Sequence, residues 1–182
     1  MPFKIEVNTL DVVQRSLPVQ LRGIQQYTWV AWDDAAAYLL DNKGNLEDAL
    51  KDANNSIQVE ERFENLMNKA RALEGLGRKA EADAARGKAM EMGSAVQLQG
   101  YGRQLQIQKQ QEKAFDIFRI NIRKNPNHWT AHNELARLAS AKGDFDTAVK
   151  EMKLSAEAAP DAFKTTLMAV VKRLENKEDI NK

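Results

Sequence analysis

Small and apolar residues recur along this chain at nearly constant intervals. Four alanines mark the pattern and stand 33, 32 and 34 residues apart: Ala49, Ala82, Ala114 and Ala148. A period near this length is typical of helical hairpins that stack side by side, because one hairpin cannot bury its own apolar face. The pattern therefore predicts an all-α chain whose four hairpins form an α-solenoid.

Other positions keep a fixed distance from these alanines. Twelve residues before them stand small residues that let helix backbones approach closely: Ala37, Ala70, Gly102 and Ala136. Nine before them stand apolar residues that predict a buried stripe: Leu40, Leu73, Leu105 and Ala139. Five before them, glycine favours a left-handed turn between the two helices of a pair, with one lysine as the exception. These four residues are Gly44, Gly77, Lys109 and Gly143.

The fourth hairpin carries the whole pattern and resembles the tetratricopeptide repeat (TPR) between Asn127 and Pro160. The matching residues are Leu135, Ala136, Gly143, Ala148 and Pro160. Pro126 and Pro160 predict where the last two hairpins end, because proline lacks the amide hydrogen. The resemblance implies hairpins at about 30–61, 63–93, 95–128 and 129–161, within a repeat region over residues 29–161. The departures from the TPR consensus are Lys69, Arg86 and His132.

The first residues follow a different pattern. Apolar and polar residues alternate between Phe3 and Val7, which predicts a short extended arm over residues 1–9. The alternative is that this segment is the remnant of a preceding β domain. Residues 10–28 predict an N-terminal helix, with Pro18 near a helix start.

Each end of the array has a candidate cap. Aromatic residues open the first hairpin, and we interpret them as a cover for its core rather than as a ligand site: Tyr27, Trp29 and Trp32. Residues 162–182 predict a capping helix followed by a charged tail that frays in solvent. The alternative for this helix is a docking element for a partner or a second copy.

The join of a strand, tryptophans and TPR-like hairpins also resembles the C-terminal part of a bacterial family of uncharacterised proteins, in which a β-rich domain precedes such repeats. This resemblance implies that the chain belongs to a longer protein whose location is the cell envelope. A cytoplasmic location is the alternative. The resemblance implies no activity.

In TPR arrays the first helix of each hairpin lines a concave groove, so the resemblance implies which side chains meet a partner. Eleven residues before the alanines stand one tyrosine and three arginines: Tyr38, Arg71, Arg103 and Arg137. Neighbouring rows add amides that can pair with a peptide backbone: Gln99, Gln106 and Asn133. Guanidinium groups on one face suit the carboxylates or carbonyls of an extended peptide. The alternative is solvated ion pairs with neighbours such as Glu74 and Glu134.

We therefore expect a protein–protein interaction scaffold that binds an extended polar or acidic peptide in the groove. A chaperone tail is not the expected partner, because Asp34 and Tyr38 stand where a carboxylate clamp would need lysine and asparagine. The alternative function is a structural or self-association module that positions a separate domain, catalytic or not. A homo-oligomer is compatible with either function.

Composition and charge argue against a nucleic-acid-binding protein and against a membrane protein. The chain is 43% hydrophobic and 29% charged with a net charge of +1, so it lacks the basic surface that nucleic acid binding needs. No run of about 18 apolar residues predicts membrane insertion, and the first residues do not resemble a secretion signal. Residues 30–61 hold eight acids and two lysines, whereas residues 95–128 hold six basic residues and two acids. We attribute this asymmetry to surface solvation.

Residues for catalysis or metal binding are scarce. The chain has no cysteine, which excludes disulfides and thiolate chemistry. Its two histidines, His128 and His132, lack an evident third ligand, whereas zinc usually takes at least three from the protein. Phosphate-binding glycine loops and nucleophile elbows are absent from the sequence. We therefore expect no enzyme activity, no cofactor and no metal.

Overall fold

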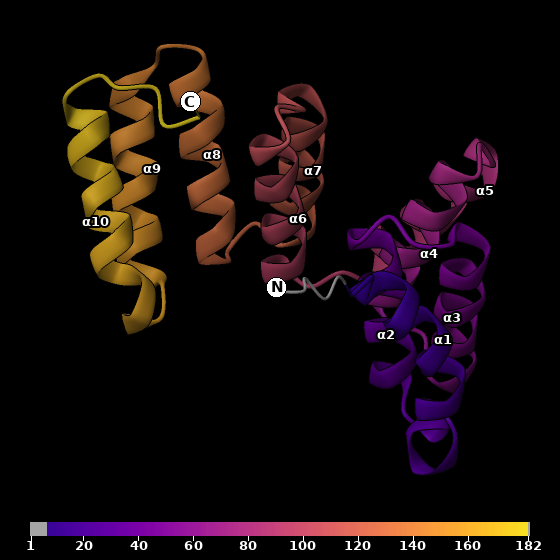
Figure 1. The fold of residues 1–182 in the computed structure, drawn as a ribbon. Helices are drawn as coiled ribbons and strands as arrows, with labels where there is room; N and C mark the ends of the chain where they lie inside the picture. Colours follow the sequence, from indigo (N-terminus) through magenta and orange to yellow (C-terminus); the bar gives the residue numbers. More distant parts are fainter. Residues whose placement is uncertain (1–6, 182) are drawn as a thin grey trace, which may run out of the picture. The chain divides into compact units, whose positions relative to one another are not determined.

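The computed structural model describes residues 7–181 of the chain (Figure 1). This range contains ten α-helices and one short 3-10 helix, and no strand occurs in it. The helices are α1 Thr9–Gln20, η1 Gly23–Tyr27, α2 Trp29–Asp41, α3 Leu46–Val59, α4 Phe63–Gly75, α5 Lys79–Met92, α6 Ala95–Ile107, α7 Gln111–Lys124, α8 Trp129–Ala141, α9 Phe145–Ala158 and α10 Asp161–Glu175. The predicted all-α class is confirmed for the described residues. The alternating residues Phe3 and Ile5 of the predicted arm lie outside them.

The helices form two compact units, each of which is described by itself. The first unit, Met1–Met92, contains α1 to α5, and the second, Gly93–Lys182, contains α6 to α10. In the first unit α2 packs against α3 and α4 against α5, and α4 also contacts α2 and α3. In the second unit α6 packs against α7 and α8 against α9, while α8 also contacts α6 and α7 and α10 covers α9. Each unit therefore contains two helical hairpins.

Five helices end in the same way, and the position of this ending repeats along the chain. After α2, α4, α6, α8 and α10, one residue takes a positive φ between 57° and 77°. These residues are 34, 32, 34 and 34 positions apart: Lys43, Gly77, Lys109, Gly143 and Lys177. In each case the next amide donates to the carbonyl five residues back, at 2.7–3.0 Å. This Schellman arrangement satisfies a carbonyl at the helix end, and it makes the five endings structurally equivalent.

The first turn differs from the sequence prediction by one residue. Lys43, and not Gly44, takes the left-handed conformation there, and it precedes Ala49 by six residues instead of five. Gly44 provides space instead, because a Cβ atom at this position would lie 2.8 Å from a methyl carbon of Leu39. The extra residue shifts α2 by one position, so Leu39 is fully buried where Leu40 was expected.

A buried polar bond joins the two helices in three of the four hairpins. Seven residues after the repeated alanines, α3, α7 and α9 carry Ser56, Asn121 and Ser155, all fully buried. Each side chain donates to a main-chain carbonyl oxygen at the start of the preceding helix. The acceptors are Trp29, Ala95 and Trp129, at 2.8, 2.8 and 2.9 Å. Because a buried hydroxyl or amide needs a partner, these bonds help to fix how the hairpin helices dock.

Small residues allow the helices to approach closely. The four repeated alanines are at most 1% exposed in the structure. Gly102 on α6 faces the fully buried ring of Phe118 on α7, and a Cβ atom at Gly102 would lie 2.3 Å from that ring. The glycine therefore makes room for the largest fully buried side chain of the described residues.

The N-terminal helix is shorter than the predicted range 10–28. α1 ends at Gln20 and the short helix η1 follows it. Pro18 lies in the last turn of α1 and not near a helix start. It has no amide hydrogen to donate to the carbonyl four residues back, and the helix ends two residues later. The indole nitrogen of Trp32 donates to the carbonyl oxygen of Gln26 at 2.9 Å, which ties η1 to α2.

The C-terminal tail differs from its prediction most strongly. α10 buries Leu167, Val171 and Leu174. The tail was predicted to fray, yet it turns back at Lys177 and buries Ile180 to 4% exposure in the core of the second unit. The contacts of residues 178–181 explain this difference and are described next.

Candidate peptide-binding site

Helix α8 carries a row of buried polar side chains on one face. Asn133, Arg137 and Ser140 follow one another at i, i+4 and i+7, a spacing that aligns side chains along a helix. Arg137 Nε donates to Asn133 Oδ1 at 3.0 Å, and this bond orients the guanidinium group. A buried row of this kind needs further partners, because unpaired polar groups in the interior are costly.

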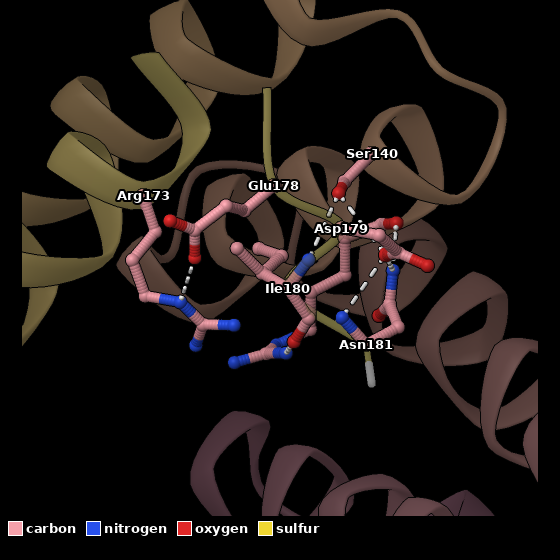
Figure 2. Close-up of polar contacts among 7 residues, drawn as sticks. Ser140, Arg173, Glu178, Asp179, Ile180 and Asn181 are labelled. Carbon is pink, nitrogen blue, oxygen red and sulfur yellow. Dashed lines mark hydrogen bonds and ion pairs between the residues drawn. The ribbon is translucent and has the colours of Figure 1, made fainter. Parts of the chain in front are cut away.

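The main chain of the C-terminal tail supplies these partners. Arg137 Nη1 donates to the carbonyl oxygen of Ile180 at 2.9 Å. The amide of Ile180 donates to Ser140 Oγ at 3.1 Å, as Figure 2 shows. The two bonds use both main-chain groups of one residue, and so they hold the backbone of a non-helical segment independently of its side chain.

Polar side chains of the tail are bound as well. Ser140 Oγ donates to Asp179 Oδ1 at 3.2 Å. Asn181 Nδ2 donates to the main-chain oxygen of Arg137 at 2.9 Å, and its Oδ1 accepts from Gln106 Nε2 at 2.9 Å. Asn181 is thereby held by two helices, α6 and α8. We call Gln106, Asn133, Arg137 and Ser140 the tail site.

An apolar contact anchors the tail between its polar residues. The Ile180 side chain belongs to the same core cluster as Ala139 of α8 and Val171 and Leu174 of α10. The bound segment therefore combines an acid, an aliphatic side chain and an amide in consecutive positions, and each meets a different part of the site.

Positive charge gathers around the tail site. Burial and then the neighbouring charges of Arg103 and Arg173 lower the pKa of Arg137 to about 9. Burial also lowers the pKa of Arg103. Arg173 on α10 is 3.0 Å from Glu178 at the start of the tail (Figure 2). Anions placed between these guanidinium groups reduce the repulsion among them. The cluster therefore favours binding of an acidic segment.

Arg103 and Gln99 lie on α6 beside the tail site. Arg103 Nη1 donates to Oε1 of Gln106, the residue that holds Asn181. Within residues 7–181, no carboxylate forms an ion pair with Arg103, which is half-buried. Gln99 is half-buried one turn earlier and makes no hydrogen bond to the described part of the tail.

The other two predicted residues belong to the first unit. Arg71 Nη2 lies 2.5 Å from Asp41 Oδ1, and Nη1 donates to Asn68 Oδ1 at 3.1 Å. Tyr38 is not equivalent to the arginines, because the extra residue in the first turn puts Ala37 at their position on α2. The structure thus brings together Gln106, Asn133 and Arg137, with Arg103 adjacent. It places Arg71 and Tyr38 in a separate unit.

Glu134 on α8 does not form the solvated ion pair that was the alternative expectation. It is fully buried, and Oε1 accepts from Asn121 Nδ2 at 2.8 Å, while Oε2 has no hydrogen-bond partner among the described residues. Burial raises its pKa to about 8, although the bond from Asn121 and the charge of Arg137 act against the shift. The carboxyl group is therefore mostly protonated at pH 7. Glu74 does form the expected kind of pair, 2.7 Å from Arg86.

The histidines have structural partners. His128 caps α8, where its Nδ1 accepts from the amide of Thr130 at 3.3 Å. His132 Nδ1 lies 2.7 Å from Glu151 Oε2 on α9. Among the described residues, no three histidine, aspartate or glutamate side chains cluster as metal ligands would.

The repeat pattern of the sequence did not predict that the C-terminal tail forms part of the site. Ser140 shares the repeat position of Gln106, eight residues before the repeated alanine, but residues 178–181 carry no repeat signal. Their only sequence signal was one isoleucine within a charged run. No protein-family model and no curated protein matches the chain. None of the helices in the described range is both long and apolar enough to span a bilayer.

Proposed function

We propose that this chain is a protein-interaction module that binds a short acidic segment of a partner at the tail site. The observation that carries the proposal is the pair of bonds from Arg137 and Ser140 to the main chain of Ile180. A site that holds both main-chain groups of one residue can hold a segment of another protein in the same way. The chain's own tail is then a resident ligand with which the partner competes.

The proposal includes a TPR-like solenoid. Two repeated features support it: the left-handed helix endings 32 or 34 residues apart, and the buried bonds seven residues after the alanines. TPR sequences share this period. In such arrays the first helices of successive hairpins form the binding face, and α6 and α8 are the first helices of the two hairpins in the second unit.

A labelled peptide of residues 176–181 tests the proposal by fluorescence anisotropy. In the full chain carrying Ile180→Ser, the resident tail loses its apolar anchor, and we expect the peptide to bind saturably. Adding Arg137→Lys should weaken binding about tenfold, because lysine lacks the fork that reaches both Asn133 and the bound carbonyl. Arg71→Lys is the matched control in the first unit and should leave binding unchanged. A folded Ile180→Ser variant that does not bind the peptide contradicts the proposal.

A structural role is the second candidate, and the burial of Ile180 favours it. In this case the tail is a permanent cap of the second unit or exchanges between two copies. The wild-type chain distinguishes these roles: a millimolar peptide of residues 176–181 should bind by displacing an exchangeable tail, whereas a permanent cap excludes it. Tail exchange between copies predicts a wild-type dimer in light scattering that Ile180→Ser abolishes.

A further inference from the structure

We infer that the partner segment carries a carboxylate directly after its acid–aliphatic–amide core, and that this carboxylate pairs with Arg103. The inference rests on the proposed function, since it concerns the chemistry of the ligand at the same site. It names a contact that the residues of the described tail do not make.

The first step concerns position. Gln106 holds the side chain of Asn181, and Arg103 lies one turn earlier on α6 and donates to the same glutamine. The amide of Gln106 is therefore a bridge between the end of the described tail and the guanidinium group of Arg103. A segment that runs from the position of Asn181 toward the start of α6 reaches Arg103 next, and we infer this course for the partner.

The second step concerns charge. Two arginines of the cluster are satisfied by the tail itself, Arg137 by a carbonyl oxygen and Arg173 by Glu178. Arg103 has only a neutral amide as its hydrogen-bond acceptor in the described residues. A half-buried guanidinium without an anion retains much of its desolvation penalty, and a carboxylate would offset it through a charge-assisted bond.

The third step concerns the resident tail. Its acids, Glu178 and Asp179, both precede Ile180, and they are engaged with Arg173 and Ser140. The residue that follows Asn181 in the sequence is Lys182, whose side chain has the same charge as Arg103. A partner with aspartate or glutamate at this position can pair with Arg103, whereas the lysine side chain cannot. This additional contact favours the partner over the resident tail.

Two amidated peptides test the inference in the full chain carrying Ile180→Ser. One is Asn-Lys-Glu-Asp-Ile-Asn-Glu and the other ends in glutamine, a neutral residue of the same shape. We expect the glutamate peptide to bind about tenfold more tightly, since a hydrogen-bonded charge pair typically has this effect. Arg103→Gln should make the two affinities equal. Arg119→Gln is the control, because Arg119 lies on α7, is exposed and pairs with Asp116 at 2.7 Å.

Each outcome has one meaning. Binding of both peptides with equal affinity to the Ile180→Ser chain overturns the inference and leaves the proposed function intact. An equal loss for both peptides in Arg103→Gln also overturns it, because Arg103 then only supports Gln106. If neither peptide binds, the proposed function itself is wrong. A tenfold preference that disappears in Arg103→Gln and persists in Arg119→Gln supports the inference.

Discussion

The two units carry an arginine at equivalent positions of α4 and α8, and the two side chains have different partners. Arg71 has a side chain that is 38% exposed, and it pairs with the exposed carboxylate of Asp41. Arg137 is 7% exposed and donates to the main chain of the tail. An exposed ion pair contributes little to stability, whereas a buried cation depends on its partners. The same residue in the same repeat position is therefore a surface charge in one unit and a binding group in the other.

Replacing each of these two arginines by alanine should reduce the stability of the two units by the most different amounts. Arg137→Ala removes the donor to the carbonyl oxygen of Ile180 and to Oδ1 of Asn133, and we expect the second unit to lose about 3 kcal/mol of stability. Arg71→Ala should reduce the stability of the first unit by less than about 1 kcal/mol. Urea unfolding with hydrogen exchange as a readout for each unit measures both values. Equal losses would show that the two arginines do not differ in role.

The buried carboxyl of Glu134 should make the second unit sensitive to pH. Burial raises its pKa from 4.5 to about 8, so its contribution to stability is complete below pH 4.5 and is lost as the pH rises through 8. Glu134→Gln should therefore gain on the order of 2 kcal/mol relative to wild type at pH 8 and almost nothing at pH 4. Urea unfolding at both pH values measures the gain. Glu74→Gln, on the exposed surface of the first unit, is the control without such a gain.

Removing a buried serine should cost the first unit more stability than the second, the opposite of the result expected for the arginines. Ser56 donates to the Trp29 carbonyl and also accepts from Asn65 Nδ2 at 2.9 Å, whereas Ser155 donates to the Trp129 carbonyl. We expect a loss of about 2 kcal/mol for Ser56→Ala and about 1 kcal/mol for Ser155→Ala, since a buried donor loses its acceptor only in the first case. Denaturant midpoints compare the two. A larger loss for Ser155→Ala would contradict the assignment of these bonds.

The left-handed turns should give the smallest effects, and similar ones in both units. Lys43→Gly and Lys109→Gly should each stabilise the chain by about 0.5 kcal/mol, because glycine takes a positive φ without strain. Gly143→Ala should destabilise it by about 1 kcal/mol for the same reason. Melting temperatures of the three variants measure these changes. A destabilised Lys43→Gly would mean that this lysine has a contact of its own.

The hairpins were predictable from sequence because each one needs the same local features. A small residue is required wherever two helices approach closely, as at Gly102 and Ala114, and this need repeats with the hairpin. The prediction for the first hairpin was off by one position, since glycine was taken as the left-handed residue and Lys43 takes this role. Turn geometry allows lysine there at a modest cost, so residue type alone did not locate the turn.

The site was only partly predictable. Asn133, Arg137 and Gln106 were identified from their repeat positions, because those positions fix which face of a helix a side chain occupies. The burial of Glu134 was not foreseen, since helical spacing does not say how much of the neighbouring surface is covered. The tail was expected to fray because charged terminal residues usually do, yet the single apolar Ile180 and its main-chain bonds hold it.

The amino-acid sequence by itself determined the helices, their pairing into hairpins and the row in which the arginines stand. These features depend on steric and turn preferences that act within about 34 residues, the length of one hairpin. Only the tertiary structure decided that Asp41 pairs with Arg71 and that the tail occupies the site at Arg137. Such choices depend on which distant group packs nearby and how much water it excludes, and no local pattern encodes either.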